Sequence, residues 1–391
     1  MLCCFPARRN GDMADPDIGA TNGMGALGDQ ETNEQHKGLG AQGAAGVSAQ
    51  AISGSEILTP LTPVSREAKG AWERPAQSCL GQPEASTSDR EDARYRLRWA
   101  VNIKQWNPWD DEWLFLLDLL PDQDQKEVEG FRFKEDQKRA LASRLLQRQC
   151  VSAAMGVAWE SVQIKRTKGR KPFATNKGLD RSQAPNFNFN VSHEGDFVVL
   201  ASEPVCICGV DVAAPQQLRA RNSQHKMSMA ELRSIFSRQF TDYEWASVDA
   251  AGPSTDAKEG MFRRLWSLKE AFVKARGDGL GFDLIKAEFH FDDGVSSNTA
   301  SVWVDGMKQT RWRFHLQELT DGHWVSVARG PPETIVDAWQ EFTGTLKEPI
   351  IATARFQEAL QAPNPAFAML EIGDLIPEKK KAEYEEAGGK L

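Results

Sequence analysis

The 391-residue chain has no apolar run near the roughly 18 residues that a membrane-spanning helix needs; its longest candidate covers only residues 151–159. Six cysteines are too few for a disulfide framework and indicate free thiols in a reducing compartment. The chain also lacks excess cations, because 47 Lys and Arg against 55 Asp and Glu give a net charge of −8. Proteins that bind mainly nucleic-acid phosphates carry a basic footprint. We therefore expect neither nucleic acid nor a membrane as a partner.

The first residues do not form a clear targeting signal. Their apolar run covers only residues 2–5, and Asp12, Asp15 and Asp17 follow it. Transit peptides, in contrast, are poor in acids. We therefore expect a cytosolic protein, with an organelle as the alternative.

Residues 1–92 have almost no aromatic side chains, with Phe5 and Trp72 as the exceptions. They are rich in Gly, Ala, Ser, Gln, Asp and Pro, a composition that cannot bury enough apolar area to fold. We expect a disordered extension. Residues 38–43 spell the dinucleotide fingerprint G-x-G-x-x-G, but a polar segment precedes them instead of the strand that the fingerprint requires.

The sequence pattern changes at residue 93. Residues 94–103 and 187–191 alternate polar and apolar side chains, which predicts strands, whereas residues 134–149 and 263–276 have helical spacing. Because strands and helices continue to about residue 330, we expect an α+β unit in two parts, 93–202 and 203–330. We expect residues 331–391 to be a polar, disordered tail with at most one or two weak helices.

Five cations lie within the seven residues 165–171 of this acidic chain: Lys165, Arg166, Lys168, Arg170 and Lys171. Gly169 permits a tight turn, and Pro172 ends the run. Concentrated cations on a turn suit a phosphate-rich ligand. A solvated surface loop is the alternative.

Three further features have candidate chemistry. His193 ends an alternating strand and could donate to an anionic oxygen. Asp211 lies inside a short apolar strand, where a carboxylate either binds a cation or is hydrogen bonded to the backbone. Glu270 and Lys274 are four residues apart on one helix face, as a metal carboxylate with a phosphate-binding lysine or as an ordinary ion pair. Together these residues describe a diphosphate held by Mg²⁺ and cations.

The motifs around these residues carry a family resemblance. They cover residues 185–196 (PNFNFNVSHEGD), 209–212 (GVDV), 266–275 (WSLKEAFVKA) and 277–282 (GDGLGF). In order and spacing they resemble the Sfp-type 4′-phosphopantetheinyl transferases over residues 95–330. The eukaryotic branch related to aminoadipate-semialdehyde dehydrogenase phosphopantetheinyl transferase is the more similar one.

The resemblance implies a pseudo-dimer of two similar α/β halves with coenzyme A in the cleft between them. It also implies a reaction that moves the phosphopantetheine arm of coenzyme A to a serine of an apo acyl or peptidyl carrier protein. The second product is adenosine 3′,5′-bisphosphate. We expect the enzyme to be a monomer, and the resemblance does not choose among fatty-acid, polyketide, peptide-synthetase and lysine-pathway carriers.

The resemblance also assigns roles to individual residues. Asp211 and Glu270 match the Mg²⁺ ligands, Lys274 matches the lysine that contacts the diphosphate, and Glu270 is the candidate base. The residues expected to bind coenzyme A are Arg166, Lys168, Lys171, Asn190, Val191, Ser192, His193 and Lys274.

The chain departs from the family pattern at two positions. Bacterial members often have a second acid two residues after the strand aspartate, where this chain has Ala213. The family's upstream arginine, which contacts coenzyme A, aligns with Glu127, so we expect Lys126 or Arg132 to replace it.

Three functions are consistent with the sequence: an Mg²⁺-dependent transferase, a catalytically degenerate coenzyme A-binding module, and an interaction scaffold. The presence of Asp211, Glu270 and Lys274 favours the transferase, because a degenerate copy is expected to lose the metal pair.

Overall fold

The computed structural model describes residues 94–176, 183–215 and 227–391. The expected disordered extension at residues 1–92, including the glycine fingerprint at 38–43, lies outside this part. Helices and strands are mixed throughout the described residues, which confirms the α+β prediction. In this part of the chain, no helix combines the length and apolar character needed to cross a membrane.

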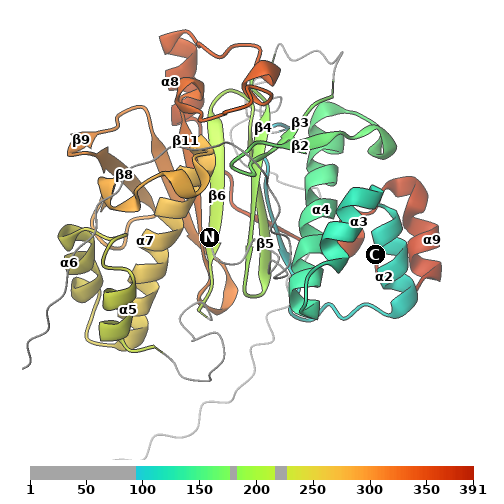
Figure 1. Cartoon of the computed structure of the whole chain (residues 1–391), viewed down its shortest axis with the longest axis horizontal. Coiled ribbons are helices and arrows are strands. Elements are labelled where there is room, and N and C mark those ends of the chain that lie inside the picture. Colours follow the sequence, from blue (N-terminus) through green and yellow to red (C-terminus); the bar gives the residue numbers. More distant parts are fainter. Residues whose placement is uncertain (1–93, 177–182, 216–226) are drawn as a thin grey trace, which may run out of the picture. The chain divides into compact units, whose positions relative to one another are not determined.

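The first group of elements runs to residue 203. Its helices are α2 (Asp110–Asp118), α3 (Asp122–Glu129) and α4 (Lys134–Met155), and its strands are β1 (Arg98–Asn102), β2 (Ile164–Arg166), β3 (Pro172–Ala174), β4 (Asn188–Glu194) and β5 (Phe197–Glu203). Strand β5 pairs antiparallel with both β1 and β4 to form the first sheet, and β2 and β3 form a separate hairpin. Helix α4 packs on β4 and β5 (Figure 1).

The second group of elements begins at residue 207. Its helices are α5 (Met229–Ile235), α6 (Asp242–Ala250) and α7 (Thr255–Arg276), and its strands are β6 (Ile207–Ala213), β7 (Ala287–Phe291), β8 (Thr299–Val304), β9 (Met307–Lys308), β10 (Arg313–Glu318) and β11 (Trp324–Gly330). The order in this second sheet is β6-β11-β10-β8-β7, and β9 pairs with β8. Helix α7 lies against β6 and β11 (Figure 1). It begins after the N-cap Ser254 and ends at Gly277, whose φ of 83° only glycine adopts readily.

The two sheets meet along β4 and β6 through side chains. Backbone N–H groups of β6 and the residue after it donate to every second side chain of β4. The donors Cys208, Val210 and Ala214 lie 2.9, 3.0 and 2.9 Å from oxygens of Asn188, Asn190 and Glu194, and the Val212 N–H is 3.4 Å from Ser192 Oγ. These contacts satisfy the N–H groups on that edge of β6, which would otherwise be buried without partners. The polar residues of the alternating strand therefore join the two sheets.

The expectation of a disordered C-terminal tail is wrong. Residues 331–391 contain α8 (Thr353–Gln361), β12 (Ala368–Leu370) and α9 (Lys381–Glu386), and β12 pairs parallel with β1 at the edge of the first sheet. The apolar residues of this segment are too widely spaced to form a periodic pattern, but they are buried against the rest of the protein: Ile351, Phe356, Leu360, Phe367, Ile372, Leu375, Ile376 and Tyr384. The segment is therefore part of the core.

A buried ion cluster fixes this segment to both sheets. Glu203 accepts hydrogen bonds from Arg96 Nε at 3.2 Å and from Arg98, and its Oε1 forms an ion pair with Arg329 Nε at 2.9 Å. Arg98 and Arg329 also donate to Asn364 Oδ1, each at 3.0 Å. Burial alone would raise the pKa of Glu203, but the three arginines lower it to about 2, so the carboxylate is charged at neutral pH.

The remaining short elements are 3-10 turns. They cover Trp159–Ser161, Gly279–Gly281, Leu284–Lys286, Thr320–Gly322, Pro332–Thr334, Thr343–Thr345, Ile372–Leu375 and Glu378–Lys380.

Candidate active site

Three of the expected site residues share one hydrogen-bonded cluster where β6 meets α7. Asp211 Oδ1 accepts from Ser192 Oγ at 2.8 Å and from Lys274 Nζ at 2.5 Å. Lys274 Nζ also lies 2.8 Å from Ser192 Oγ. Asp211 and Ser192 are buried, whereas the Lys274 side chain is 23% exposed. The cluster therefore has one open side, at the lysine.

Glu270 is buried one helical turn before Lys274. Burial, and after it the charge of Asp211, raises the pKa of Glu270 above its ordinary value, while Lys274 opposes the rise. A cation bound beside both carboxylates would relieve the repulsion that Glu270 experiences from Asp211.

The donor set at this junction fits Mg²⁺. Among residues 94–176, 183–215 and 227–391, no three His, Cys, Asp or Glu side chains form a group that could hold a metal ion. Mg²⁺ does not need one, since it takes one or two carboxylates and completes its shell with water and phosphate oxygens. Asp211 and Glu270 would supply the two carboxylates, and Ala213 leaves the third position to water.

The close approach of β6 and α7 depends on Gly209. A Cβ atom built on Gly209 would lie 2.1 Å from the Ala271 carbonyl oxygen and 2.4 Å from the Ala275 nitrogen. The strand can touch the helix backbone only because residue 209 has no side chain. This contact brings Asp211 within reach of Lys274.

His193 lies on the other face of β4 from Ser192. Burial, followed by the charges of Lys274, Arg139 and Arg144, lowers the pKa of His193 to about 3, so the imidazole is neutral at neutral pH. Its Nδ1 is buried and has no hydrogen-bond partner among the described residues. The ring therefore has a nitrogen available for a ligand, in surroundings rich in cations.

The basic run 165–171 begins in β2 and continues through the turn that leads to β3. Its cations differ in their exposure to solvent. Lys168 and Arg170 are exposed, and Arg166 is half-buried. Burial and then the charge of Arg144 lower the pKa of Arg166, but a guanidinium remains charged at neutral pH. Lys171 is only 3% exposed and donates to two backbone carbonyls. The sequence pattern suggested that Lys171 is one of the solvent-facing cations of the loop. In the structure its side chain is instead buried.

The positions of Asn190 and Val191 also differ from the expectation. The Asn190 side chain is buried and accepts from the Val210 N–H, so it joins the sheets and does not face a ligand. Val191 is half-buried and packs against the apolar core of the first sheet. The Asn190 side chain is therefore engaged at the junction of the two sheets.

One cation near His193 lies outside the set of residues expected from the sequence. Both expected replacements, Lys126 and Arg132, are exposed. Arg144 of α4, in contrast, is one of the cations that lower the pKa of His193, and its Nη2 donates to Glu127 Oε2 at 2.6 Å. Its Nε also donates to Asp124 at 3.1 Å. Glu127, the residue that we expect to align with the family's arginine, thus pairs with Arg144.

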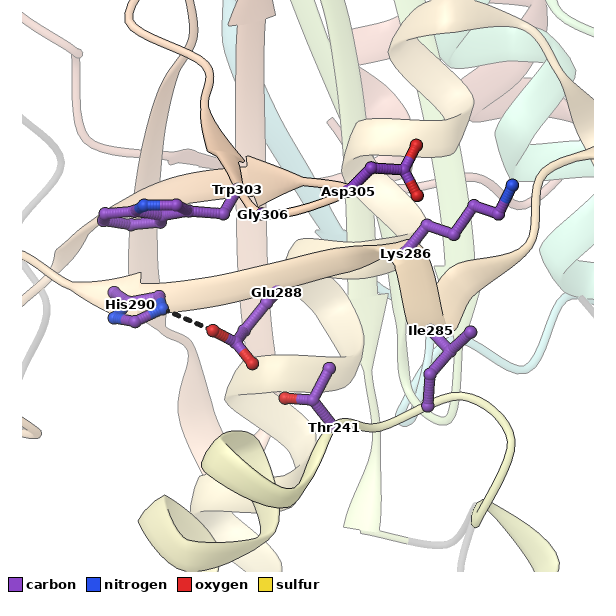
Figure 2. A pocket seen from close by; sticks show the side chains of 8 residues that line it. All are labelled: Thr241, Ile285, Lys286, Glu288, His290, Trp303, Asp305 and Gly306. Carbon is purple, nitrogen blue, oxygen red and sulfur yellow. Dashed lines mark hydrogen bonds and ion pairs between the residues drawn. The ribbon is translucent and has the colours of Figure 1, made fainter.

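A pocket on the second sheet lies apart from all of these residues. It is lined by Thr241, Ile285, Lys286, Glu288, His290, Trp303, Asp305 and Gly306 (Figure 2). The His290 ring stacks on Tyr243 and lies tilted against Trp303, with centroid distances of 3.9 and 4.0 Å, and its Nε2 lies 2.8 Å from Glu288 Oε1. None of the expected site residues lines this pocket.

An α+β protein with a carboxylate pair, a lysine and a cationic surround fits an enzyme that handles phosphorylated substrates. Two family comparisons specify the class. Residues 104–205 match "4′-phosphopantetheinyl transferase, N-terminal", and residues 207–328 match the "4′-phosphopantetheinyl transferase superfamily".

Individual relatives agree with the family matches. The L-aminoadipate-semialdehyde dehydrogenase-phosphopantetheinyl transferase of Mus musculus is 32% identical over 242 residues, which are 61% of this chain and 75% of the relative. The protein of the same name from Xenopus laevis is 35% identical over 60% of this chain and 76% of its own length. A phosphopantetheinyl transferase of Thraustochytrium sp. is 36% identical over 59% of this chain and 77% of its own length. The chain therefore belongs to the 4′-phosphopantetheinyl transferase family and is a transferase.

Proposed function

We propose that this enzyme transfers the 4′-phosphopantetheine group of coenzyme A to a serine of an apo acyl or peptidyl carrier protein, with Mg²⁺, and releases adenosine 3′,5′-bisphosphate. The observation that carries the proposal is the junction of β6 and α7, where Asp211, Glu270 and Lys274 lie together beside Ser192. When bound there, Mg²⁺ would neutralise charge on the diphosphate.

Side chains of the protein would bind the diphosphate and accept the proton of the carrier serine. Lys274, at the open side of the cluster, holds a diphosphate oxygen, and Asp211 and Ser192 fix the direction of its ammonium group. Glu270 is the proposed acceptor of the proton of the carrier serine, directly or through a water. The serine belongs to the partner, so this chain needs no nucleophile of its own.

We also propose that the two sheets are the halves of a pseudo-dimer and that coenzyme A binds where they meet. In this proposal Arg166, Lys168 and His193 contact its phosphates, and the backbone of residues 190–192 lines the nucleotide site. A neutral His193 contributes a hydrogen bond there, and the arginines contribute the charge.

The test of the function is a carrier modification assay. Purified protein, coenzyme A and Mg²⁺ should add the mass of one phosphopantetheine group to apo carrier proteins in intact-mass spectrometry, and EDTA should abolish the gain. Fatty-acid, polyketide, peptide-synthetase and L-aminoadipate-semialdehyde dehydrogenase carriers should be compared. Coenzyme A binding without modification of any carrier would instead indicate the degenerate binding module.

Asp211→Asn should lower kcat/KM by on the order of 100-fold or more, because Lewis-acid stabilisation of a transition state is worth several kcal/mol. The substitution keeps the side-chain size, so the thermal unfolding midpoint should change little. Asp293→Asn, at an exposed position of the second half, is the matched control. Wild-type turnover of the Asp211→Asn variant would contradict the assignment of this site.

We propose that Arg144, a cation near His193, also contacts coenzyme A. Arg144→Met should then weaken binding of coenzyme A by about 10- to 100-fold, since a hydrogen bond to a charged group contributes about 1.5–3 kcal/mol. Arg132→Met is the control, because Arg132 is the exposed replacement expected from the sequence. Isothermal titration with coenzyme A and with adenosine 3′,5′-bisphosphate measures both variants. If Arg132→Met weakened binding and Arg144→Met did not, the assignment of Arg144 would be wrong.

A further inference from the structure

Lys171 links the hairpin of the first half to the catalytic helix of the second. Its Nζ donates to the Cys208 carbonyl of β6 at 2.6 Å and to the Lys274 carbonyl of α7 at 3.3 Å. The residue is 3% exposed, and its ammonium lies 5.8 Å from the centroid of the Phe342 ring. One side chain thus contacts the strand that carries Asp211, the helix that carries Glu270, and the C-terminal segment.

The position of Lys171 at the end of α7 has a physical reason. The last carbonyls of a helix have no partner within the helix, and the negative end of the helix dipole attracts a cation. Lys171 supplies a donor to the carbonyl of Lys274, and the Val336 N–H supplies one to the carbonyl of Arg276 at 2.8 Å. Both donors come from outside the helix, so the last turn of α7 depends on them for its position.

The hairpin tip is held against the same helix end. Thr167 N–H and Lys171 C=O are bonded at 3.0 Å, and Lys171 N–H donates to Thr167 Oγ1 at 3.1 Å, which closes the loop. A Cβ atom on Gly169 would lie 2.2 Å from the Gly277 carbonyl oxygen, so the loop touches the C-cap of α7 directly. Behind it, Phe173 packs on Phe342 with ring centroids 5.5 Å apart. Hydrogen bonds, a close backbone contact and aromatic packing therefore all hold the hairpin against the C-terminal end of α7.

We propose that Lys171 is a positioning residue: it fixes the backbone of Lys274 and of β6 from the opposite half, and it does not bind the phosphates of coenzyme A. The inference deepens the proposed function, on which it rests. The hairpin that bears Arg166 also bears Lys171, so the loop that meets the nucleotide also sets the place of Lys274. A shift of about 1 Å in a positioned group can cost on the order of 100-fold in rate. The contact of Lys171 with the backbone of Lys274 should therefore affect turnover.

The test compares Lys171→Met, which keeps the length but not the charge, with Lys165→Met, at an exposed cation of the same hairpin that has no proposed contact with coenzyme A. For Lys171→Met we expect kcat to fall about 10- to 100-fold, while the dissociation constant for coenzyme A changes less than about threefold. Hydrogen exchange of the last turn of α7 and of Gly277 should become faster. Lys165→Met should leave this exchange and kcat unchanged. A loss of coenzyme A binding of tenfold or more in Lys171→Met, with helix exchange unchanged, would overturn the proposal in favour of a phosphate contact, and an unchanged kcat would also overturn it.

A second measurement uses the wild-type chain and does not depend on how the variant folds. Amine acetylation followed by mass spectrometry should label Lys165 readily and Lys171 slowly, with and without coenzyme A. Labelling of Lys171 that is fast in the free enzyme and blocked by coenzyme A would show a phosphate ligand and refute the positioning role. Neither exchange nor labelling requires turnover, so a failure of the transfer assay in the wild type is distinguishable from a failure of this inference.

Discussion

A chain that ends at Gly330 is expected not to fold, although the family matches end before that residue. Removal of residues 331–391 takes β12 away from β1 and removes Asn364 from the buried arginines Arg98 and Arg329. It also uncovers apolar surface on both sides of the sheet junction, because Phe356 packs with Val205 and Leu375 packs in the first core. Each fully buried side chain of this kind contributes about 1.5–3 kcal/mol, against a total stability of about 5–15 kcal/mol for a domain. Circular dichroism and thermal unfolding of the truncated chain measure the loss.

The control for this truncation is a chain that ends at Ile376. It retains β12, Asn364 and the residues that pack on Val205, and it loses α9 with Tyr384, whose hydroxyl donates to Glu112 at 2.9 Å. This shorter deletion should give a folded protein with a lower unfolding midpoint. If the chain ending at Gly330 unfolded within a few degrees of the full chain, the C-terminal segment would not be part of the core as described.

Gly209→Ala should abolish most of the activity and also destabilise the protein. The new methyl group would lie 2.1 Å from the Ala271 carbonyl oxygen and 2.9 Å from the Ala275 Cα, and backbone atoms of a packed helix cannot rotate away as a side chain can. Strand β6 and α7 must therefore separate, which moves Asp211 away from Lys274. We expect a decrease in kcat/KM on the order of 100-fold and a loss of about 1–3 kcal/mol or more in the free energy of unfolding. Steady-state kinetics with a carrier protein and denaturant unfolding measure the two effects.

Gly260→Ala is the matched control, because Gly260 lies on the same helix and its nearest non-neighbouring atom would be Arg263 Nη2, at 3.9 Å from the new Cβ. There the methyl group has space, and alanine favours a helix over glycine by about 0.8–1 kcal/mol. This variant should keep its activity and gain stability. Full activity of Gly209→Ala would mean that the spacing of β6 and α7 does not set the geometry of the site.

The sequence was informative where structure depends on near neighbours. Alternation predicted β1 and β4, and helical spacing predicted α4 and α7, because a period of 2 or 3.6 residues is a local property of the chain. Periodicity did not predict the ordered C-terminal segment, residues 331–391. Its strand β12 has three residues, and its buried residues are separated by polar stretches, so no period marks them. Its order comes from partners that are distant in the sequence. Tyr384 is bonded to Glu112, 272 residues away, and Asn364 is bonded to Arg98, 266 residues away.

The sequence was likewise informative about some features of the candidate site and not about others. The sequence by itself determined the family and the identities of Asp211, Glu270 and Lys274 as candidates, since motif and spacing are written in the chain. Only the tertiary structure decided the direction of each side chain. Lys171 and Lys168 look alike in the basic loop, yet one is buried on the carbonyls of Cys208 and Lys274 and the other is exposed. Composition cannot separate them, because a lysine's role depends on which acceptors the fold brings within about 3 Å of its ammonium group.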